Sequence, residues 1–274
     1  MIVLPQIAAL GYPNIDPEIF RIGWFALRWY SLAYIAGLLI GWWYLGRLAR
    51  RRDAPFSRQH ADDFFFWAAM GIIVGGRLGY VLFYKPLEYL SNPAAILRLW
   101  DGGMSFHGGL VGVILAVLLF CRKNRLDPFR FTDFLACVVP IGLFFGRLAN
   151  FINNELWGKV SDLPWAMYSP TTGPFPRHPS QLYEAFLEGV LLFAVLNFAM
   201  YKTSAAKYPG MIGGMFFLIY GSSRYVVEFV REPDAHLGRF GGWITMGQIL
   251  SLPMIAFGLY MIWRSYKVLA AKNS

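Results

Sequence analysis

Charged residues are scarce in this sequence. Only 15% of its 274 residues are charged, against about 25% in a typical soluble domain. Hydrophobic residues make up 57% of the chain and occur in long runs, which a soluble fold of this length could not bury. The net charge of +9 does not indicate nucleic-acid binding, because the basic residues alternate with apolar runs and form no stripe. The composition predicts a membrane protein, and we expect no nucleic-acid partner.

Cysteine is also rare. The two cysteines, Cys121 and Cys137, lie in or beside apolar runs. Two thiols exclude a disulfide framework and cannot form a zinc site alone. No cluster of His, Cys and carboxylate residues has the spacing of metal ligands. We therefore interpret both cysteines as packing residues and expect neither a metal nor a cofactor.

Seven stretches approach the roughly 20 apolar residues that a transmembrane helix needs. They run over Phe25–Gly46, Phe64–Tyr84, Met104–Cys121, Phe131–Asn150, Gln181–Tyr201, Gly210–Val230 and Thr245–Trp263. The first twenty residues lack the basic start of a cleavable signal peptide, so we expect the spans themselves to direct insertion. We predict an all-α integral membrane protein of about seven transmembrane helices, with residues 1–274 forming one polytopic domain.

The connections between these spans differ in basic charge. Fourteen lysines and arginines lie in the connections on one side and seven lie on the other. The more basic side faces the cytoplasm, so we expect the N-terminus outside and the C-terminus inside. Residues 151–180, between spans four and five, are rich in tryptophan and proline and predict a small extracytoplasmic cap.

Glycines four residues apart recur within the spans. Examples are Gly71, Gly75 and Gly79 in span two, and Gly108 and Gly112 in span three. This spacing allows two helix backbones to approach closely. We therefore interpret most of these glycines as helix-packing residues.

Four arginines fall within the predicted spans: Arg28, Arg77, Arg147 and Arg224. An arginine at the centre of a transmembrane helix costs about 2.5–3.5 kcal/mol on insertion scales. All four lie toward the outer leaflet, where phospholipid headgroups are the most abundant anions. Guanidinium groups bind phosphate oxygens through two parallel hydrogen bonds, which favours a buried anionic substrate site. Alternatively, the arginines extend to the outer headgroups or pair with carboxylates in a structural role.

Two further spacings bring charged residues onto single helix faces. The two sets are Arg224, Glu228 and Arg231, and Gln181, Glu184 and Glu188. His107 opens span three between glycines that allow another chain to approach. It is either a structural hydrogen-bonding residue or an acid–base group at the mouth of the cationic site.

Four strings carry a resemblance to a known family. They are GGRLGYVLFY (75–84), GGMSFHGG (102–109), GRLANFINNELWG (146–158) and HPSQLYEA (178–185). With them, the chain resembles the bacterial phosphatidylglycerol–prolipoprotein diacylglyceryl transferases over all the predicted spans. The resemblance implies a multi-pass protein of the bacterial cytoplasmic (inner) membrane. Its implied partners are phosphatidylglycerol, prolipoprotein signal peptides with a lipobox cysteine, and membrane lipids.

The resemblance also implies a reaction. The sn-1,2-diacylglyceryl group would move from phosphatidylglycerol to the lipobox thiol, forming a thioether and releasing glycerol phosphate. We expect catalytic roles for His107, Arg147, Arg224 and Glu228. We expect substrate binding by Tyr30, Arg77, Arg147, Asn150, Glu155 and Arg231. The substrate thiol would lose its proton either to His107 or through the field of the arginines alone, and both possibilities stay open.

Two other function classes compete with this interpretation. A lipid or anion transporter would also use intramembrane arginines, but its site is expected near the bilayer midplane and not toward one leaflet. An intramembrane serine protease would use Ser105. Ser105 precedes Phe106 and lacks the glycine-flanked motif of such enzymes, and it lies only two residues from His107.

Overall fold

The computed structural model describes residues 10–13, 15–23, 25–232, 239–240 and 243–273. Its contacts divide the chain into two compact units. Unit 1 comprises Met1–Gly41 and Leu135–Ser274, and unit 2 comprises Trp42–Phe134. The divisions fall inside helix α1 (Trp29–Leu48) and helix α5 (Pro128–Ala136). Each of these two helices therefore begins in one unit and ends in the other.

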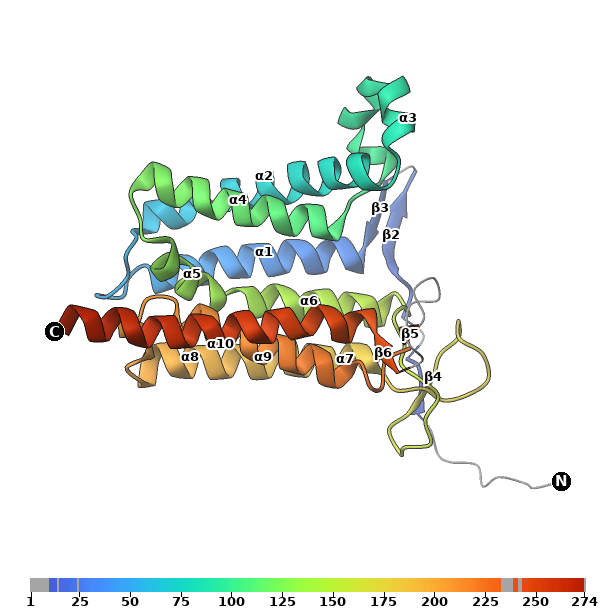
Figure 1. The fold of residues 1–274 in the computed structure, drawn as a ribbon. Helices are drawn as coiled ribbons and strands as arrows, with labels where there is room; N and C mark the ends of the chain where they lie inside the picture. Colours follow the sequence, from blue (N-terminus) through green and yellow to red (C-terminus); the bar gives the residue numbers. More distant parts are fainter. Residues whose placement is uncertain (1–9, 14, 24, 233–238, 241–242, 274) are drawn as a thin grey trace. The chain divides into compact units, whose positions relative to one another are not determined.

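Unit 2 is built on the packing of α2 (Arg58–Phe83) against α4 (Phe106–Asn124) (Figure 1). Glycines line the contact between them. A Cβ atom on Gly71 would lie 2.7 Å from the carbonyl oxygen of Gly112, and one on Gly79 would lie 2.7 Å from the Cα of Gly108. The two backbones could not approach this closely with larger residues, which confirms the predicted packing role.

The N-termini of both helices are capped by serine. The Ser57 hydroxyl accepts a hydrogen bond from the backbone N–H of His60, and the His60 side chain accepts one from the Ser57 N–H. The Ser105 hydroxyl accepts from the N–H of Gly108 at 3.2 Å. Ser105 is buried and satisfies one of the N–H groups that a helix start leaves unpaired. Its structural use agrees with the weak case for a serine protease.

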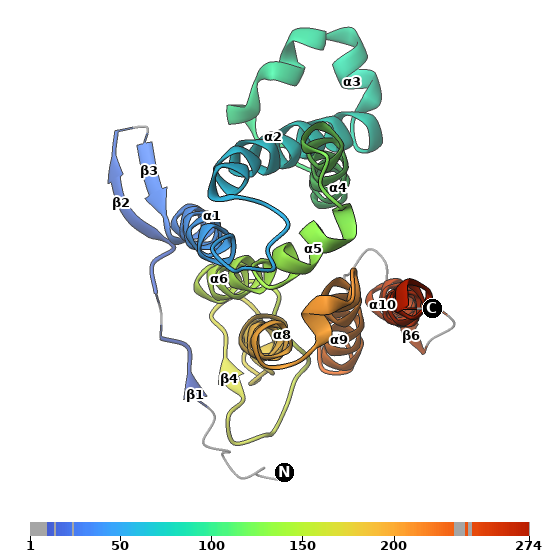
Figure 2. The ribbon, with the colours of Figure 1, turned by 90° about the vertical axis from the view of Figure 1, so that its left-hand side faces the viewer.

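The segment between α2 and α4, residues 85–103, is called the arm here. It contains α3 (Pro86–Ser91) and two 3-10 turns, η1 (Pro93–Leu97) and η2 (Leu99–Asp101). Figures 1 and 2 show the arm extending sideways from the C-terminal end of α2. It therefore protrudes from the helix pair instead of continuing along it.

In unit 1 a β-hairpin directly precedes the first helix. Strand β2 (Glu18–Ile22) pairs antiparallel with β3 (Phe25–Arg28), and α1 follows. The prediction that span one starts at Phe25 is therefore wrong, because these residues satisfy their backbone groups by strand pairing. Arg28 lies at the end of the hairpin, where its Nη2 is 3.2 Å from the Glu18 carboxylate. Its side chain is 59% exposed and belongs to strand β3 and not to the helix that follows.

The remaining helices of unit 1 follow α5 in the chain. They are α6 (Val139–Ile152), the continuous run α7 (Ser180–Glu184), η3 (Ala185–Leu191) and α8 (Leu192–Lys202), α9 (Met211–Val227) and α10 (Met246–Asn273), with the 3-10 turn η4 (Ala205–Lys207) before α9. Of these, η3 is a π-helix. Helices α6, α8, α9 and α10 run side by side, as both ribbon views show (Figures 1 and 2).

The predicted cap, residues 151–180, is an irregular segment of unit 1. Strand β4 (Met167–Tyr168) pairs in parallel with β1 (Leu10–Gly11), and Val160 and Met167 each form a bridge to Arg177. Short strands β5 (Arg239–Phe240) and β6 (Ile244–Thr245) pair just before α10. All strands in the described residues belong to two-stranded sheets.

Four helices of the described chain are long and apolar enough to cross a membrane: Arg58–Phe83, Phe106–Asn124, Ser180–Lys202 and Met246–Val268. Helices α5 and α6, bent by 41° at a short break, would together make a fifth. Helix α9 is apolar but only 17 residues long. The structure thus confirms a mostly helical membrane protein, with four or five candidate spans by length and composition.

Candidate active site

Three arginines and three glutamates of unit 1 form one ion-pair network. They are Arg147 on α6, Glu184 at the end of α7, Glu188 in η3, Arg224 on α9, and Glu228 and Arg231 just after α9. The network brings together four of the predicted site residues: Arg147, Arg224, Glu228 and Arg231. The formal charges of its members balance.

Glu184 is the centre of this network, because its carboxylate contacts all three arginines. Its Oε2 lies 2.9 Å from Nη1 of Arg147. Its Oε1 lies 2.7 Å from Nη1 of Arg224 and 3.1 Å from Nη1 of Arg231. The other two glutamates each pair with one arginine: Glu188 with Arg147 at 3.1 Å, and Glu228 with Arg224 at 2.8 Å.

Burial differs between the two signs of charge. The side chains of Glu184 and Glu188 are 1% and 0% exposed, whereas those of Arg147 and Arg224 are each 17% exposed. The arginines are therefore the more accessible members of the network, and Glu184 and Glu188 are its buried members.

The π-helix η3 positions Glu188. A Cβ atom on Gly189 would lie 2.7 Å from the Cβ of Phe144, so η3 and α6 touch at this point. Arg147 lies one turn further along α6, beside Glu188. Short π-helical turns are frequent at functional sites. Here the turn places a fully buried carboxylate against Arg147.

Asn150, in the last turn of α6, contacts Glu155 just beyond that helix. The side-chain amide of Asn150 donates to Oε1 of Glu155 at 2.6 Å, and the Gln181 amide donates to the Glu155 carbonyl oxygen. Asn154 and Leu156 have φ angles of 56° and 61°, which turn the backbone sharply on either side of Glu155. This turn fixes two predicted substrate-binding residues beside the start of α7.

Tyr30 lies in the first turn of α1, within unit 1. Its hydroxyl lies 3.3 Å from that of Tyr34. Its phenol interacts electrostatically with the charges of Glu155 and Arg147. Tyr30 is therefore a neighbour of the network without being a member of it.

His107 and Arg77 belong to unit 2. His107 is an exposed residue in the first turn of α4, with its ring edge-to-face against Phe106 at 5.6 Å between centroids. The structure thus divides the predicted site residues between the two units. The ion-pair network is in unit 1, and His107 is at the start of a helix of unit 2.

Arg77 is buried and binds the backbone of the arm. Its Nε donates to Ile96 at 2.8 Å, and its Nη2 donates to Ala95 and Arg98 at 2.7 and 3.0 Å. Its Nη1 donates to Gly102 and to Gly103. All five N–H groups of the guanidinium are thereby engaged. The described contacts give Arg77 a scaffolding role, and its predicted role in substrate binding stays a prediction.

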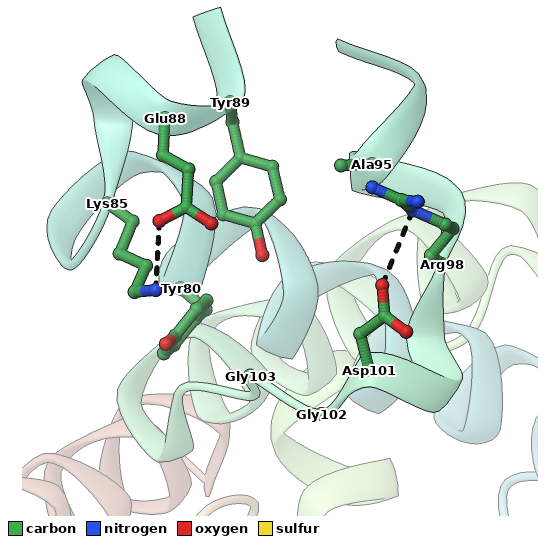
Figure 3. A pocket seen from close by; sticks show the side chains of 9 residues that line it. All are labelled: Tyr80, Lys85, Glu88, Tyr89, Ala95, Arg98, Asp101, Gly102 and Gly103. Atoms are coloured by element: carbon green, nitrogen blue, oxygen red, sulfur yellow. Dashed lines mark ion pairs between the residues drawn. The ribbon is translucent and has the colours of Figure 1, made fainter. Parts of the chain in front are cut away.

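The arm encloses a small polar pocket of about 120 Å³. Figure 3 shows its lining, in which Lys85 pairs with Glu88 at 2.8 Å and Arg98 pairs with Asp101 at 3.3 Å. The ring of Tyr89 lies between these two pairs. Because each cation already has a carboxylate partner within its own turn, the pocket carries no excess charge that would select an ion.

Glu184 and Glu188 were not among the predicted site residues. The sequence does hold a signal for them, since two glutamates four residues apart occupy one face of an apolar helix. A buried carboxylate needs a cationic partner, and the intramembrane arginines were the available partners. Both residues can therefore be added to the site.

His178 lies two residues before α7, outside the predicted spans. Its Nδ1 is 3.2 Å from the Tyr183 hydroxyl. Partial burial, with a smaller contribution from the Lys159 ammonium, lowers the pKa of His178 below its ordinary value. The ring is therefore neutral at pH 7, unlike the charged groups of the nearby network.

Comparison with known proteins identifies the family. The family model described as prolipoprotein diacylglyceryl transferase matches residues 17–264. The chain belongs to the prolipoprotein diacylglyceryl transferase family. Phosphatidylglycerol–prolipoprotein diacylglyceryl transferases of Brucella anthropi and Brucella canis are each 53% identical to it, and that of Brucella ovis is 52% identical. In each case the similarity covers 97% of this chain and 97% of the relative. The ion-pair network is thus a feature of a membrane transferase.

Proposed function

We propose that this enzyme transfers the sn-1,2-diacylglyceryl group of phosphatidylglycerol to the lipobox cysteine thiol of a prolipoprotein. The sulfur attacks carbon 3 of the diacylglycerol unit and the bond from that carbon to the phosphate oxygen breaks. The electron pair leaves with glycerol phosphate, and the thiol proton passes to a base. The observation that carries the proposal is the network of three partly exposed arginine side chains paired with buried carboxylates.

The arginines supply what this displacement needs most. Negative charge builds up on the departing phosphate, and preorganised donors stabilise such charge without having to reorient. Arg147 and Arg224 are held by Glu184, and Arg224 is also held by Glu228. Their side chains therefore keep a fixed direction before the lipid arrives. We assign phosphate binding to both, and orientation of Arg224 to Glu228.

The nucleophile needs activation, because a cysteine thiol has a pKa of about 8.5 and is mostly protonated at neutral pH. His107 is our candidate base, since it is exposed at the start of α4 and an imidazole nitrogen can accept a proton. The positive field of the arginines could instead promote ionisation of the thiol. The two routes differ in their pH dependence, because only loss of a base is compensated when the thiol ionises unaided at high pH.

The remaining residues would bind the substrates. Asn150 and Glu155 form a polar pair next to Arg147, and Tyr30 lies nearby. They suit the glycerol hydroxyls of the phosphatidylglycerol headgroup. Arg231 pairs with the Glu184 carboxylate and so adds a third guanidinium group to the proposed binding site.

A transfer assay tests the reaction directly. Purified enzyme is incubated with phosphatidylglycerol carrying labelled acyl chains and a lipobox peptide, and we expect the label to appear in the peptide as a thioether. A peptide with serine in place of cysteine is the matched control and should stay unlabelled. Movement of lipid between leaflets without labelling of peptide would support the transporter alternative and overturn the proposal.

We also propose the finer topology. Seven spans, with the N-terminus periplasmic, the C-terminus cytoplasmic and residues 151–180 forming the extracytoplasmic cap, follow from the basic residues of the connections. The bacterial inner membrane is the expected location. A reporter fused after Ser274 that is active only in the periplasm would contradict this orientation.

A further inference from the structure

Glu188 occupies the edge of Arg147 that a phosphate would bind. Its Oε2 accepts hydrogen bonds from both Nε and Nη2 of Arg147, at 3.3 and 3.1 Å. These two parallel N–H groups form the edge that binds oxyanions in a bidentate manner. A carboxylate of the protein thus occupies the place proposed for the substrate phosphate.

Glu188 is also the carboxylate that is easiest to displace from Arg147. Glu184 contacts Arg147 too, but it holds two further arginines, so releasing it would break three ion pairs. Glu188 pairs only with Arg147 among the described residues, and its second oxygen, Oε1, is buried with no hydrogen-bond partner there. Displacing Glu188 therefore breaks the fewest contacts.

The charge balance of the network gives this displacement a consequence. Three arginines face three glutamates, so a bound phosphodiester makes the site net negative. Cleavage of the carbon–oxygen bond adds further negative charge to the leaving group. A nearby carboxylate repels both species, and it repels the glycerol phosphate product more strongly than the lipid.

We propose that Glu188 is a displaceable counterion of Arg147. It holds the guanidinium before the lipid binds, yields that edge to the lipid phosphate, and returns to it as glycerol phosphate leaves. This inference rests on the proposed function. Glu188 acts through Arg147 and is therefore a positioning residue, which limits substrate affinity and speeds product release.

The isosteric variant Glu188→Gln tests the idea, because it removes the charge with little change in shape. We expect the KM for phosphatidylglycerol and the inhibition constant of glycerol phosphate each to fall about tenfold. kcat should fall in parallel as product release becomes limiting, with a burst of about one product per enzyme. A purely structural role would lower kcat without tightening either constant. Glu232→Gln, the same change at an exposed glutamate that pairs with Arg177, should leave all three values unchanged.

Unchanged or weaker affinity for both ligands in a folded Glu188→Gln protein would overturn the proposal. Where this variant does not fold, Glu188→Asp takes its place. Its shorter carboxylate keeps the charge but reaches Arg147 less well, so an intermediate decrease in KM is expected, and an increase would contradict the idea.

A binding titration separates this proposal from the reaction itself. Binding of short-chain phosphatidylglycerol is measured in detergent without acceptor peptide, with phosphatidylcholine as the control lipid. Tighter binding of phosphatidylglycerol to Glu188→Gln would support the counterion role even if no peptide were labelled. Conversely, normal transfer by the wild type with no change in binding would leave the reaction intact and reject the counterion.

Discussion

Arg77 and Arg147 have almost the same local sequence but opposite surroundings. Both follow a glycine and precede a leucine in an apolar helix. Arg77 directs all its N–H groups to backbone carbonyls of the arm, whereas Arg147 pairs with two carboxylates and stays 17% exposed. Carbonyl partners come from a folded segment and fix its shape. Carboxylate partners are single side chains that an anion can replace. The type of partner thus separates a scaffolding arginine from a binding one.

The largest expected effect is at Arg147. Lysine keeps the charge but cannot form two parallel hydrogen bonds, so Arg147→Lys should lose activity nearly as severely as Arg147→Ala, by about 10³-fold. Rates of peptide labelling measure this, with folding checked by thermal denaturation. If Arg147→Lys keeps most of its activity, Arg147 acts as a point charge and its contrast with Arg77 is weaker than the geometry indicates.

The second largest effect is expected at His107, a residue of unit 2 with no ion-pair partner among the described residues. His107→Gln should slow transfer at neutral pH by about 10²-fold, at the lower end of the range for general-base assistance, and leave lipid binding intact. Raising the pH toward the thiol pKa should restore much of the rate, because the thiol then ionises unaided. Arg224→Ala is the control and should not recover in alkali. Parallel pH–rate profiles for wild type and His107→Gln would show that His107 does not accept the proton.

Arg77→Lys tests whether Arg77 is a scaffolding residue that holds the arm. Lysine has three N–H groups, so at least two of the five carbonyls lose their donor, and we expect a loss of about 3 kcal/mol in stability. Hydrogen exchange of residues 95–103 should rise strongly, while the KM for lipid should change little in the folded protein. Impaired lipid binding with unchanged exchange would restore the predicted substrate-binding role of Arg77.

The smallest expected effect concerns His178, a partly buried group without an ion-pair partner among the described residues. Its pKa is lower in the folded protein than its ordinary value of 6.5. Protons therefore bind more tightly to the unfolded chain, and the contribution of His178 to stability is complete above about pH 6.5 and is lost as the pH falls below it. Relative to His178→Asn, the wild type should lose about 1–2 °C in melting temperature between pH 7.5 and 5.5. An equal loss in both proteins would contradict the assignment.

Much of the helical layout was predictable from hydropathy. The predicted spans Gln181–Tyr201 and Gly210–Val230 coincide with the α7–α8 run and with α9 to within a few residues. The first span was placed too early, because apolar character alone does not distinguish the strand Phe25–Arg28 from a helix start. The break between α5 and α6 was missed too, since Cys137 and Val138 are as apolar as their neighbours.

The site was predictable in part. Helical spacing placed Arg224, Glu228 and Arg231 together, and intramembrane arginines signalled an anion site. The spacing of Glu184 and Glu188 was visible in the sequence. The sequence could not show that the Glu184 carboxylate contacts three arginines from different segments. That depends on the packing of α6, η3 and α9, which only the fold determines. The intramembrane-arginine argument grouped Arg28 and Arg77 with Arg147, because residue type does not reveal the partner.

The five carbonyl partners of Arg77 also constrain how the protein is made. They lie 18 to 26 residues after Arg77 in the chain, so they leave the ribosome later than the arginine does. At about 5–20 residues per second, the delay is about one to five seconds. During that interval Arg77 has none of these acceptors, although α2 is a candidate span and a lone arginine opposes insertion. Stable insertion of α2 should therefore wait until the arm has been synthesised and has supplied these acceptors.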